Sequence, residues 1–235
     1  MAETTVANRI AVVTGGRGFI GSAIVRKLEE TGHQVVVVDR EGDYSADLAN
    51  EDDVRRIGAH ILQSFGQVDV LVHAAAAFDR AILSDLTSSL MRRVMSVNVE
   101  APLWLLQQFT PGMATRGSGR VVFIVSDTFF DPPPVPDVLP YVATKGALIG
   151  AARSLARSLG ADGITVNCVA PGFTPPPIDL PGLGKEHAAA VVLRQALPRS
   201  LVPDDVAEVV AFLASPSAQA VTGQTICPDG GLVLR

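Results

Sequence analysis

Tyr141 and Lys145 are two residues whose types and spacing suit proton transfer. They follow the breaker Pro140 and open an Ala- and Leu-rich run to Leu159, which predicts a helix. Side chains four positions apart lie on one helix face and can touch. A free phenol has a pKa of about 10, and a neighbouring ammonium group lowers it by favouring the phenolate. Tyr141 could then move a proton on or off a substrate oxygen. Tyr-x-x-x-Lys alone equally describes a half-buried tyrosine beside a surface lysine, so the surrounding elements decide its meaning.

A glycine-rich turn near the N-terminus predicts a nucleotide site. An apolar strand expected over Arg9–Thr14 runs into Gly15-Gly-Arg-Gly18-Phe-Ile-Gly21, and a helix is expected over Ser22–Thr31. Strand, glycine turn and helix in this order let a pyrophosphate approach the helix N-terminus, where free N–H groups and the helix dipole favour anions. A plain strand-to-helix turn is the alternative.

Asp39 bears on which dinucleotide is bound. It ends the second expected strand, Gln34–Val38, about 20 residues after the glycines, where a carboxylate can hydrogen-bond the adenosine ribose. The same charge repels the extra phosphate of NADP, whereas a guanidinium of Arg17 or Arg40 can pair with that phosphate. We therefore expect NAD(H) to be preferred, with NADP(H) possible, and Asp47-Leu48 to lie beside the adenine.

The remaining chain alternates between strand and helix patterns, which predicts a single α/β domain over residues 1–235. Its architecture is a doubly wound parallel sheet with helices on both faces, and ligands bind beyond the carboxyl ends of such strands. Ser126 directly follows one strand, and Asn98 indicates a kink inside a helical region because of its low helix propensity. Further strands are expected over Val68–Val72, Arg120–Val125, Ile164–Val169 and Thr222–Cys227, and further helices over Asp52–Phe65, Leu83–Phe109, Glu186–Ala196 and Asp204–Ala214.

Two proline-rich segments are expected to shape a substrate pocket. One lies between Ser126 and Tyr141, and the other opens a substrate loop over about residues 173–197. Lys185 and Arg194 are interpreted as surface charges, so we expect a neutral cyclic or aromatic alcohol or ketone as substrate. The apolar walls are expected from Phe129, Phe130, Leu139, Phe173, Ile178 and Leu180.

Composition argues against several other classes of protein. Hydrophobic residues make up 48% and charged residues 18%, which suits a sheet buried on both faces. The net charge is −5 without a basic stripe, which disfavours nucleic acid as a partner. No signal peptide and no apolar run of the ~20 residues that span a membrane are found. Scattered histidines and the isolated Cys168 and Cys227 predict no metal site and a reducing, cytoplasmic setting.

Taken together, these motifs resemble the short-chain dehydrogenase/reductase family, and the resemblance covers almost the entire chain. Four residues match its catalytic tetrad in order, namely Asn98, Ser126, Tyr141 and Lys145. The second half of the chain matches further family motifs at Asn167, Pro171-Gly172, Arg199, Asp205-Val206-Ala207, Phe212-Leu213, Thr222-Gly223 and Asp229-Gly230-Gly231.

The resemblance implies a Rossmann-type fold and hydride transfer between a nicotinamide cofactor and a secondary alcohol or ketone. It implies that Tyr141 is the acid/base, that Ser126 hydrogen-bonds the substrate oxygen and that Asn98 holds a water for proton relay. Lys145 would bind the nicotinamide ribose and lower the pKa of Tyr141, and the protein would be a homotetramer or homodimer. The expected cofactor contacts are Gly15, Arg17, Gly18, Phe19, Ile20, Asp39, Arg40, Asp47, Leu48, His73, Ala74, Ala75, Tyr141, Lys145, Pro171, Gly172, Phe173 and Thr174.

Three positions depart from the usual pattern of family members of this length. Phe19 stands where most have glycine, His73-Ala-Ala-Ala76 replaces Asn-Asn-Ala-Gly, and Pro176 occupies a usual threonine position after an early Thr174. The first two resemble the longer, extended members, which include epimerases and dehydratases, although the chain is too short for their C-terminal domain. Two alternatives therefore stand beside the dehydrogenase: chemistry with transient oxidation by bound NAD, and a non-catalytic dinucleotide-binding regulator.

Overall fold

The computed structural model describes residues 9–135, 137–176 and 184–234. Its centre is a parallel sheet in the order β3-β2-β1-β4-β5-β6-β7, so the predicted doubly wound sheet is confirmed. The order reverses between β1 and β4, and all carboxyl ends face one edge, where ligands of such sheets bind. The strands are β1 (Arg9–Thr14), β2 (His33–Asp39), β3 (Tyr44–Ser45), β4 (Val70–His73), β5 (Gly119–Ile124), β6 (Ile164–Val169) and β7 (Thr225–Ile226).

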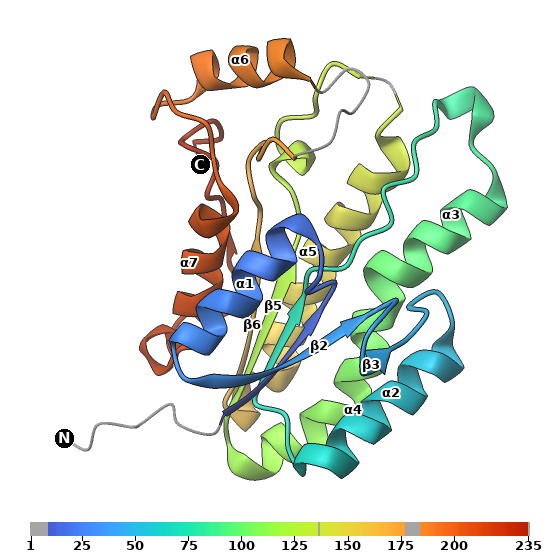
Figure 1. The fold of residues 1–235 in the computed structure, drawn as a ribbon, viewed down its shortest axis with the longest axis vertical. Helices are drawn as coiled ribbons and strands as arrows, with labels where there is room; N and C mark the ends of the chain where they lie inside the picture. Colours follow the sequence, from blue (N-terminus) through green and yellow to red (C-terminus); the bar gives the residue numbers. More distant parts are fainter. Residues whose placement is uncertain (1–8, 136, 177–183, 235) are drawn as a thin grey trace.

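Helices cover both faces of this sheet (Figure 1). On one face, α2 (Glu51–Phe65), α4 (Ala101–Arg116) and α5 (Leu139–Leu159) bury apolar side chains against the strands. On the other face, α1 (Phe19–Glu30) and α7 (Pro203–Ala214) do the same. The central strands β5 and β6 are entirely buried, which explains their Val- and Ile-rich sequences. The single α/β domain is therefore held by two apolar layers, and its strand ends have fixed positions.

The helical region predicted over Leu83–Phe109 is divided in the structure. A short 3₁₀ turn (Leu83–Asp85) and α3 (Ser88–Met95) lead into a π-helical turn over Ser96–Glu100, and α4 follows. π-helical turns carry one extra residue per turn and redirect side chains, often at functional sites. Asn98 lies inside this turn and is fully buried, so the predicted kink is confirmed as a π-helical turn.

Two helices, α1 and α5, begin two or three residues before their predicted starts. The helix α1 begins at Phe19, directly after Gly18, rather than at Ser22, so Gly21 lies inside the helix. The helix α5 begins at Leu139, so Pro140 lies in its first turn instead of preceding it. Proline is tolerated there because the first N–H groups of a helix have no partner within the helix. The helix α6 (Lys185–Arg194) lies beyond the carboxyl ends of the strands, across from them in Figure 1.

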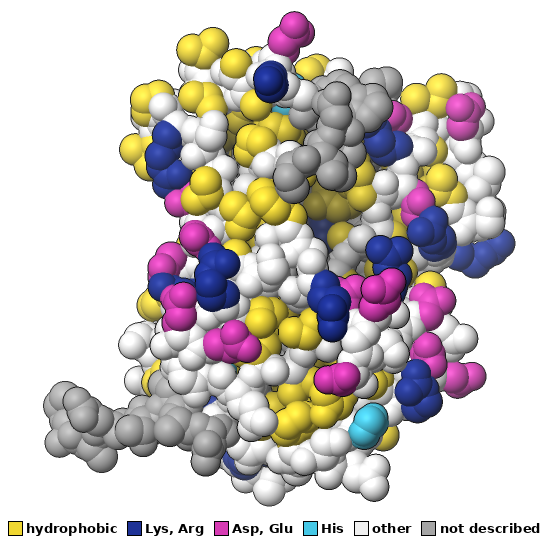
Figure 2. All heavy atoms as spheres, in the orientation of Figure 1, with side chains coloured by type: hydrophobic (Ala, Val, Ile, Leu, Met, Phe, Trp, Pro, Cys, Tyr) yellow, Lys and Arg dark blue, Asp and Glu magenta, His cyan; other side chains and the backbone are white. Residues whose placement is uncertain are grey.

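Figure 2 shows this face of the molecule in space-filling form. It is hollowed at the level where the strands end, below α6. Hydrophobic side chains lie inside the hollow, and charged side chains of both signs gather along its edge.

Candidate active site

A cleft of about 1520 Å³ lies at the carboxyl ends of the strands. Sites for a single small ligand commonly measure roughly 300–1,000 Å³, so this cleft has room for a dinucleotide and a substrate together. It collects almost every residue predicted for the site: Gly15, Arg17, Gly18, Phe19, Ile20, Asp39, Arg40, Asp47, Leu48, Ala74, Ala75, Ser126, Tyr141, Lys145, Pro171, Gly172, Phe173 and Thr174.

The glycine turn is packed tightly against the segment that follows β4. Gly15 has a φ of +69°, and a Cβ there would lie 2.6 Å from the backbone of Ala75. Gly18 forms the N-cap of α1, and its N–H donates to the carbonyl of Gly15 at 3.0 Å. The first turn of α1 therefore presents its amides to the cleft, where a pyrophosphate would be favoured by hydrogen bonds and the helix dipole. These residues fit the predicted dinucleotide.

Asp39 lies at the end of β2 and lines the part of the cleft where the sequence predicts the adenosine ribose. Its carboxylate accepts the backbone N–H groups of Arg17 at 3.0 Å and of Arg40 at 2.8 Å. The first bond ties the glycine turn to the end of β2, and the side chains of all three residues line the cleft. The guanidinium of Arg17 lies against Gly42, a glycine with a φ of +109°. Asp39, which favours NAD, therefore lies beside Arg17 and Arg40, which could favour NADP.

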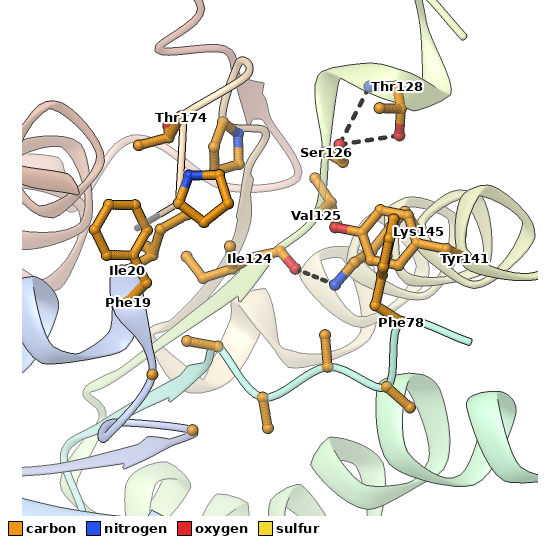
Figure 3. Close-up of a pocket in the computed structure, with 18 of the residues that line it drawn as sticks. Phe19, Ile20, Phe78, Ile124, Val125, Ser126, Thr128, Tyr141, Lys145 and Thr174 are labelled. Atoms are coloured by element: carbon orange, nitrogen blue, oxygen red, sulfur yellow. Dashed lines mark hydrogen bonds between the residues drawn. The ribbon is translucent and has the colours of Figure 1, made fainter. Parts of the chain in front are cut away.

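Tyr141 and Lys145 lie on one face of α5, as their spacing predicts, and point toward the end of β5 (Figure 3). Lys145 Nζ donates to the carbonyl of Ile124 at 2.8 Å and lies 5.1 Å from the centre of the Tyr141 ring. Burial lowers the pKa of Lys145 to about 8. Burial also raises the pKa of Tyr141 to about 12, partly offset by a hydrogen bond with Ser126, although the tyrosine keeps some contact with solvent. The expected lowering of the Tyr141 pKa by Lys145 is therefore not what the structure shows, because the ammonium faces a carbonyl and the ring, and desolvation dominates.

Ser126 stands at the end of β5, beside Tyr141, and opens a 3₁₀ turn (Asp127–Phe129). Its Oγ accepts hydrogen bonds from the hydroxyl of Thr128 at 2.9 Å and from the Thr128 N–H at 3.3 Å. It also donates to Oδ1 of Asp127 at 3.3 Å. These contacts hold the Ser126 hydroxyl in place. Its own donated bond, to Asp127, is long, so a substrate oxygen could replace Asp127 as the acceptor.

Asn98 and His73 do not line the cleft in the described part of the chain. The Asn98 amide accepts the N–H of Ala77 at 2.7 Å, and donates to the carbonyl of Ala77 at 3.0 Å and to the hydroxyl of Thr144 at 2.9 Å. His73 Nδ1 lies 2.7 Å from the hydroxyl of Thr14 and ties β4 to β1. Burial, followed by the charge of Lys145, lowers the pKa of His73 to about 3. The structure therefore gives His73 a place in the sheet interior rather than the predicted cofactor contact.

The walls of the substrate end differ in part from the prediction. Phe129 packs over Gly146 of α5, Phe130 packs against the core, and neither they nor Leu139 are among the described cleft residues. Phe173 does line the cleft, edge-on to His187 at 4.7 Å between ring centres. Phe78, which the sequence analysis did not identify, also lines the cleft and lies edge-on to Tyr141, with 4.8 Å between ring centres. Ile178 and Leu180 fall outside the described residues.

Arg194 and Asp127 are two charged residues of the cleft to which the sequence analysis gave no role. Arg194 is exposed, as interpreted there, but it also lines the cleft and donates to both carboxylate oxygens of Asp131 at 2.8 Å. Asp127 lines the cleft with 5% of its surface exposed, and burial followed by the charge of Asp229 raises its pKa to about 7. Its position directly after Ser126 was the only signal in the sequence.

Residues from the end of the chain support the other wall. The N–H of Gly172 donates to the carbonyl of Pro228 at 3.2 Å, and a Cβ on Gly172 would lie 2.7 Å from Asp229 Cα. The Asp229 carboxylate accepts the N–H groups of Gly231 and Val233, both at 2.9 Å. The Pro171-Gly172 and Asp229-Gly-Gly motifs are therefore explained by packing against each other.

Two features that would indicate other functions are absent from the described residues. Among residues 9–135, 137–176 and 184–234, no group of three or more His, Cys, Asp and Glu side chains is placed to hold a metal ion. None of the helices in the same ranges is long and apolar enough to cross a membrane.

Comparison with known proteins assigns the chain to a family. The model of a short-chain dehydrogenase/reductase family described as enoyl-(acyl carrier protein) reductase matches residues 17–233. The chain belongs to the short-chain dehydrogenase/reductase family. The human dehydrogenase/reductase SDR family member 4 is 32% identical over 98% of this chain and 89% of its own length. A probable galactose dehydrogenase of Rhizobium meliloti is 33% identical over 96% of this chain and 95% of its own length.

Solved structures agree with this assignment. A blue fluorescent protein from a metagenomic library, crystallised in complex with NADPH, matches with a TM-score of 0.86 and 30% identity. The match covers 98% of this short-chain dehydrogenase/reductase and 100% of that chain. Family and structural neighbour together establish an oxidoreductase with a nicotinamide dinucleotide cofactor.

Proposed function

We propose that this short-chain dehydrogenase/reductase transfers a hydride between NAD(H) and a secondary alcohol or ketone, with Tyr141 as the acid/base. The observation that carries the proposal is that Ser126, Tyr141 and Lys145 meet at the end of β5, inside the cleft that contains the glycine turn. The bound cofactor supplies the hydride acceptor or donor. The side chains of this chain position the substrate oxygen and move its proton.

In the reduction direction, Ser126 and Tyr141 both donate hydrogen bonds to the carbonyl oxygen. Tyr141 gives up its proton as that oxygen becomes an alkoxide, which is general-acid catalysis. Because the pKa of Tyr141 is raised to about 12, the phenol is protonated at neutral pH and ready to donate. In the oxidation direction the phenol must first lose that proton, so we expect alcohol oxidation to accelerate through the alkaline range.

The preference for NAD(H) is proposed from Asp39. Its carboxylate lines the cleft at the end of β2 and would lie close to an extra phosphate on the adenosine ribose. Arg17 and Arg40 oppose this preference, since both also line the cleft and could neutralise that phosphate. The charge of Asp39 is held in place by two backbone N–H groups, and we weigh it above the two exposed guanidinium groups.

The substrate is proposed to be a neutral cyclic or aromatic alcohol or ketone. Phe78 packs edge-on to Tyr141, Phe173 and Val138 also line the cleft, and the guanidinium of Arg194 is engaged by Asp131. The Rhizobium relative is a probable galactose dehydrogenase, which agrees with a ring-shaped alcohol as substrate. Transient-oxidation chemistry gains no support from His73, which is buried within the sheet. A non-catalytic regulator is disfavoured because Ser126, Tyr141 and Lys145, three of the four predicted catalytic residues, meet in the cleft.

The test is turnover with a panel of secondary alcohols and ketones, with NAD(H) and NADP(H), followed by absorbance of the reduced cofactor. Tyr141→Phe should lower kcat by about 10²–10⁴-fold while NADH still binds, because only the transferred proton is removed. Tyr44→Phe is the matched control, since Tyr44 packs against His60 and Phe65 away from the cleft. Full turnover by Tyr141→Phe would refute the mechanism.

We also propose that the protein is a homotetramer or homodimer that works without nucleic acid or membrane partners. Light scattering coupled to size-exclusion chromatography gives the mass directly. A monomer at micromolar concentration would contradict the assembly.

A further inference from the structure

Asp127 is a buried carboxyl group whose use the proposed reaction does not explain. It follows Ser126 at the end of β5, and its own N–H donates to the carbonyl of Pro171 at 3.1 Å, which fixes the residue between two walls of the cleft. Asp127 is among the residues that line the cleft, and 5% of its surface is exposed. A buried carboxyl group is costly unless it is well hydrogen-bonded, so each one needs an explanation.

Within the part of the chain that the structure describes, the Asp127 carboxyl accepts few strong hydrogen bonds. Ser126 donates to its Oδ1 at a long 3.3 Å, and the Thr128 N–H gives further support. Asp229 shows the contrast, because its two carboxylate oxygens each accept a backbone N–H at 2.9 Å and shape a turn. The Asp127 carboxyl is therefore held by fewer and longer hydrogen bonds than the Asp229 carboxylate, and it belongs to a residue that lines the cleft.

The distance from Ser126 indicates what Asp127 could bind. Ser126 is expected to hold the reacting oxygen of the substrate, and the Asp127 carboxyl lies one hydrogen-bond length from the same hydroxyl. Two oxygens on adjacent carbon atoms in the gauche arrangement are separated by a similar length. A hydroxyl on the neighbouring carbon would therefore reach Asp127 while the reacting oxygen stays on Ser126 and Tyr141.

The charges around Asp127 favour a neutral partner. Asp229 and Asp131 face it and disfavour a substrate anion, while Arg194, already bound to Asp131, is the nearby cation. Burial and Asp229 hold the pKa of Asp127 at about 7, so both its protonated and ionised forms are present near neutral pH. The carboxyl can then donate to or accept from a hydroxyl group.

We propose that Asp127 makes the enzyme selective for substrates that carry a second hydroxyl group on the carbon adjacent to the reacting carbon, that is, α-hydroxy ketones and 1,2-diols. The inference rests on the proposed function, because it places the reacting oxygen on Ser126 and Tyr141. It assigns Asp127 as a specificity-determining residue in direct contact with the substrate.

The first experiment compares kcat/KM for 2-hydroxycyclohexanone and cyclohexanone with NADH. The wild type should prefer the hydroxy ketone by about 10- to 100-fold, the range of one hydrogen bond to a buried carboxyl group. Asp127→Ala should bring the ratio close to one, and Asp127→Asn should keep part of it because an amide still donates and accepts. A ratio is insensitive to the amount of folded protein.

Asp131→Asn is the matched control, since Asp131 is a neighbouring carboxylate at the same rim of the cleft. It should leave the substrate ratio as in the wild type. Equal use of both ketones by the wild type, or an unchanged ratio in Asp127→Ala, would overturn the proposal. So would a ratio that depends on Asp131 instead, or a stronger preference for the corresponding 2-amino ketone.

Binding to the NADH-loaded protein separates this inference from the proposed function. trans-1,2-Cyclohexanediol and cyclohexanol cannot be oxidised in that complex, so calorimetry measures their affinity without turnover. Tighter binding of the diol that Asp127→Ala abolishes, without turnover of any ketone, would refute the proposed reaction and uphold the role of Asp127. Turnover of ketones with equal binding of diol and alcohol would uphold the reaction and refute the role of Asp127.

Discussion

Replacement of Gly15 by alanine tests how tightly the glycine turn is packed against the segment after β4. Gly15 has a φ of +69°, in the left-handed region that side chains disfavour. The new Cβ would also lie 2.6 Å from the backbone of Ala75, a separation that real Cβ atoms do not adopt. Gly66 offers a matched control, because its φ is +73° and nothing lies within 4 Å of a Cβ built on it.

Both substitutions place alanine in a left-handed conformation, but only Gly15→Ala also makes the new Cβ overlap with neighbouring backbone. Gly66→Ala should lower the free energy of unfolding by about 1–2 kcal/mol, the cost of a left-handed alanine. Gly15→Ala should add about 1–3 kcal/mol for the overlap with a backbone that side-chain motion cannot relieve. For a chain of this size 1 kcal/mol shifts Tm by about 2–4 °C, so Gly15→Ala should melt several degrees below Gly66→Ala.

Thermal unfolding followed by circular dichroism measures the stability difference, and NADH fluorescence titration measures the local effect. Gly15→Ala should weaken NADH binding by at least about tenfold, because the turn must move away from Ala75 and carries the first amides of α1 with it. Gly66→Ala should bind NADH like the wild type. Equal melting temperatures for the two variants, or normal NADH affinity in Gly15→Ala, would show that the turn is not closely packed.

Three further substitutions test the electrostatics of the site. Asp127, with its pKa raised from 3.8 to about 7, binds an extra proton in the folded state, so its contribution to stability falls as pH rises between these values. Asp127→Asn should therefore raise the free energy of unfolding at pH 8 by up to about 4 kcal/mol and by little at pH 4, which urea titrations at both pH values check. His73, with its pKa lowered from 6.5 to about 3, contributes stability above pH 6.5 that is lost as pH falls through this range, so the drop in Tm over it should be shallower in His73→Asn. Asp39→Asn should improve the affinity for NADPH relative to NADH by about tenfold, because it removes the charge that opposes the extra phosphate. Unchanged relative dissociation constants would show that the charge of Asp39 does not set the cofactor preference.

Periodic apolar patterns sufficed to predict the sheet and most helices. The strands β1 and β6 have the predicted bounds, since each is a buried apolar run next to a turn signal. The split of the region around Asn98 was predictable only as a kink, because a π-helical turn has no apolar periodicity of its own. Helix starts near Phe19 and Pro140 were missed because the first turn of a helix is set by backbone packing and tolerates proline.

The sequence predicted which residues form the candidate site, but it predicted few of their hydrogen-bond partners and pKa shifts. Residues after strand ends reach the same edge of a parallel sheet, which is why nearly all the predicted contacts line one cleft. Contacts made across the fold have no local signal: Arg194 reaches Asp131, and His73 turns inward to Thr14. The direction of the Tyr141 pKa shift was likewise missed, because spacing places Lys145 nearby without specifying that its ammonium faces Ile124.

Four titratable groups near the end of β5 share one electrostatic feature. The pKa values of Tyr141 and Asp127 are raised and those of Lys145 and His73 are lowered, so each moves toward its uncharged form. Desolvation is the largest cause in all four, whereas their charged neighbours differ. The fold as a whole therefore sets the protonation of the site, through two apolar layers that seal both faces of the sheet where these groups emerge. Admission of water between α5 and β5 would accordingly move all four pKa values back together, while removal of one charged neighbour would move mainly the pKa of the group it faces.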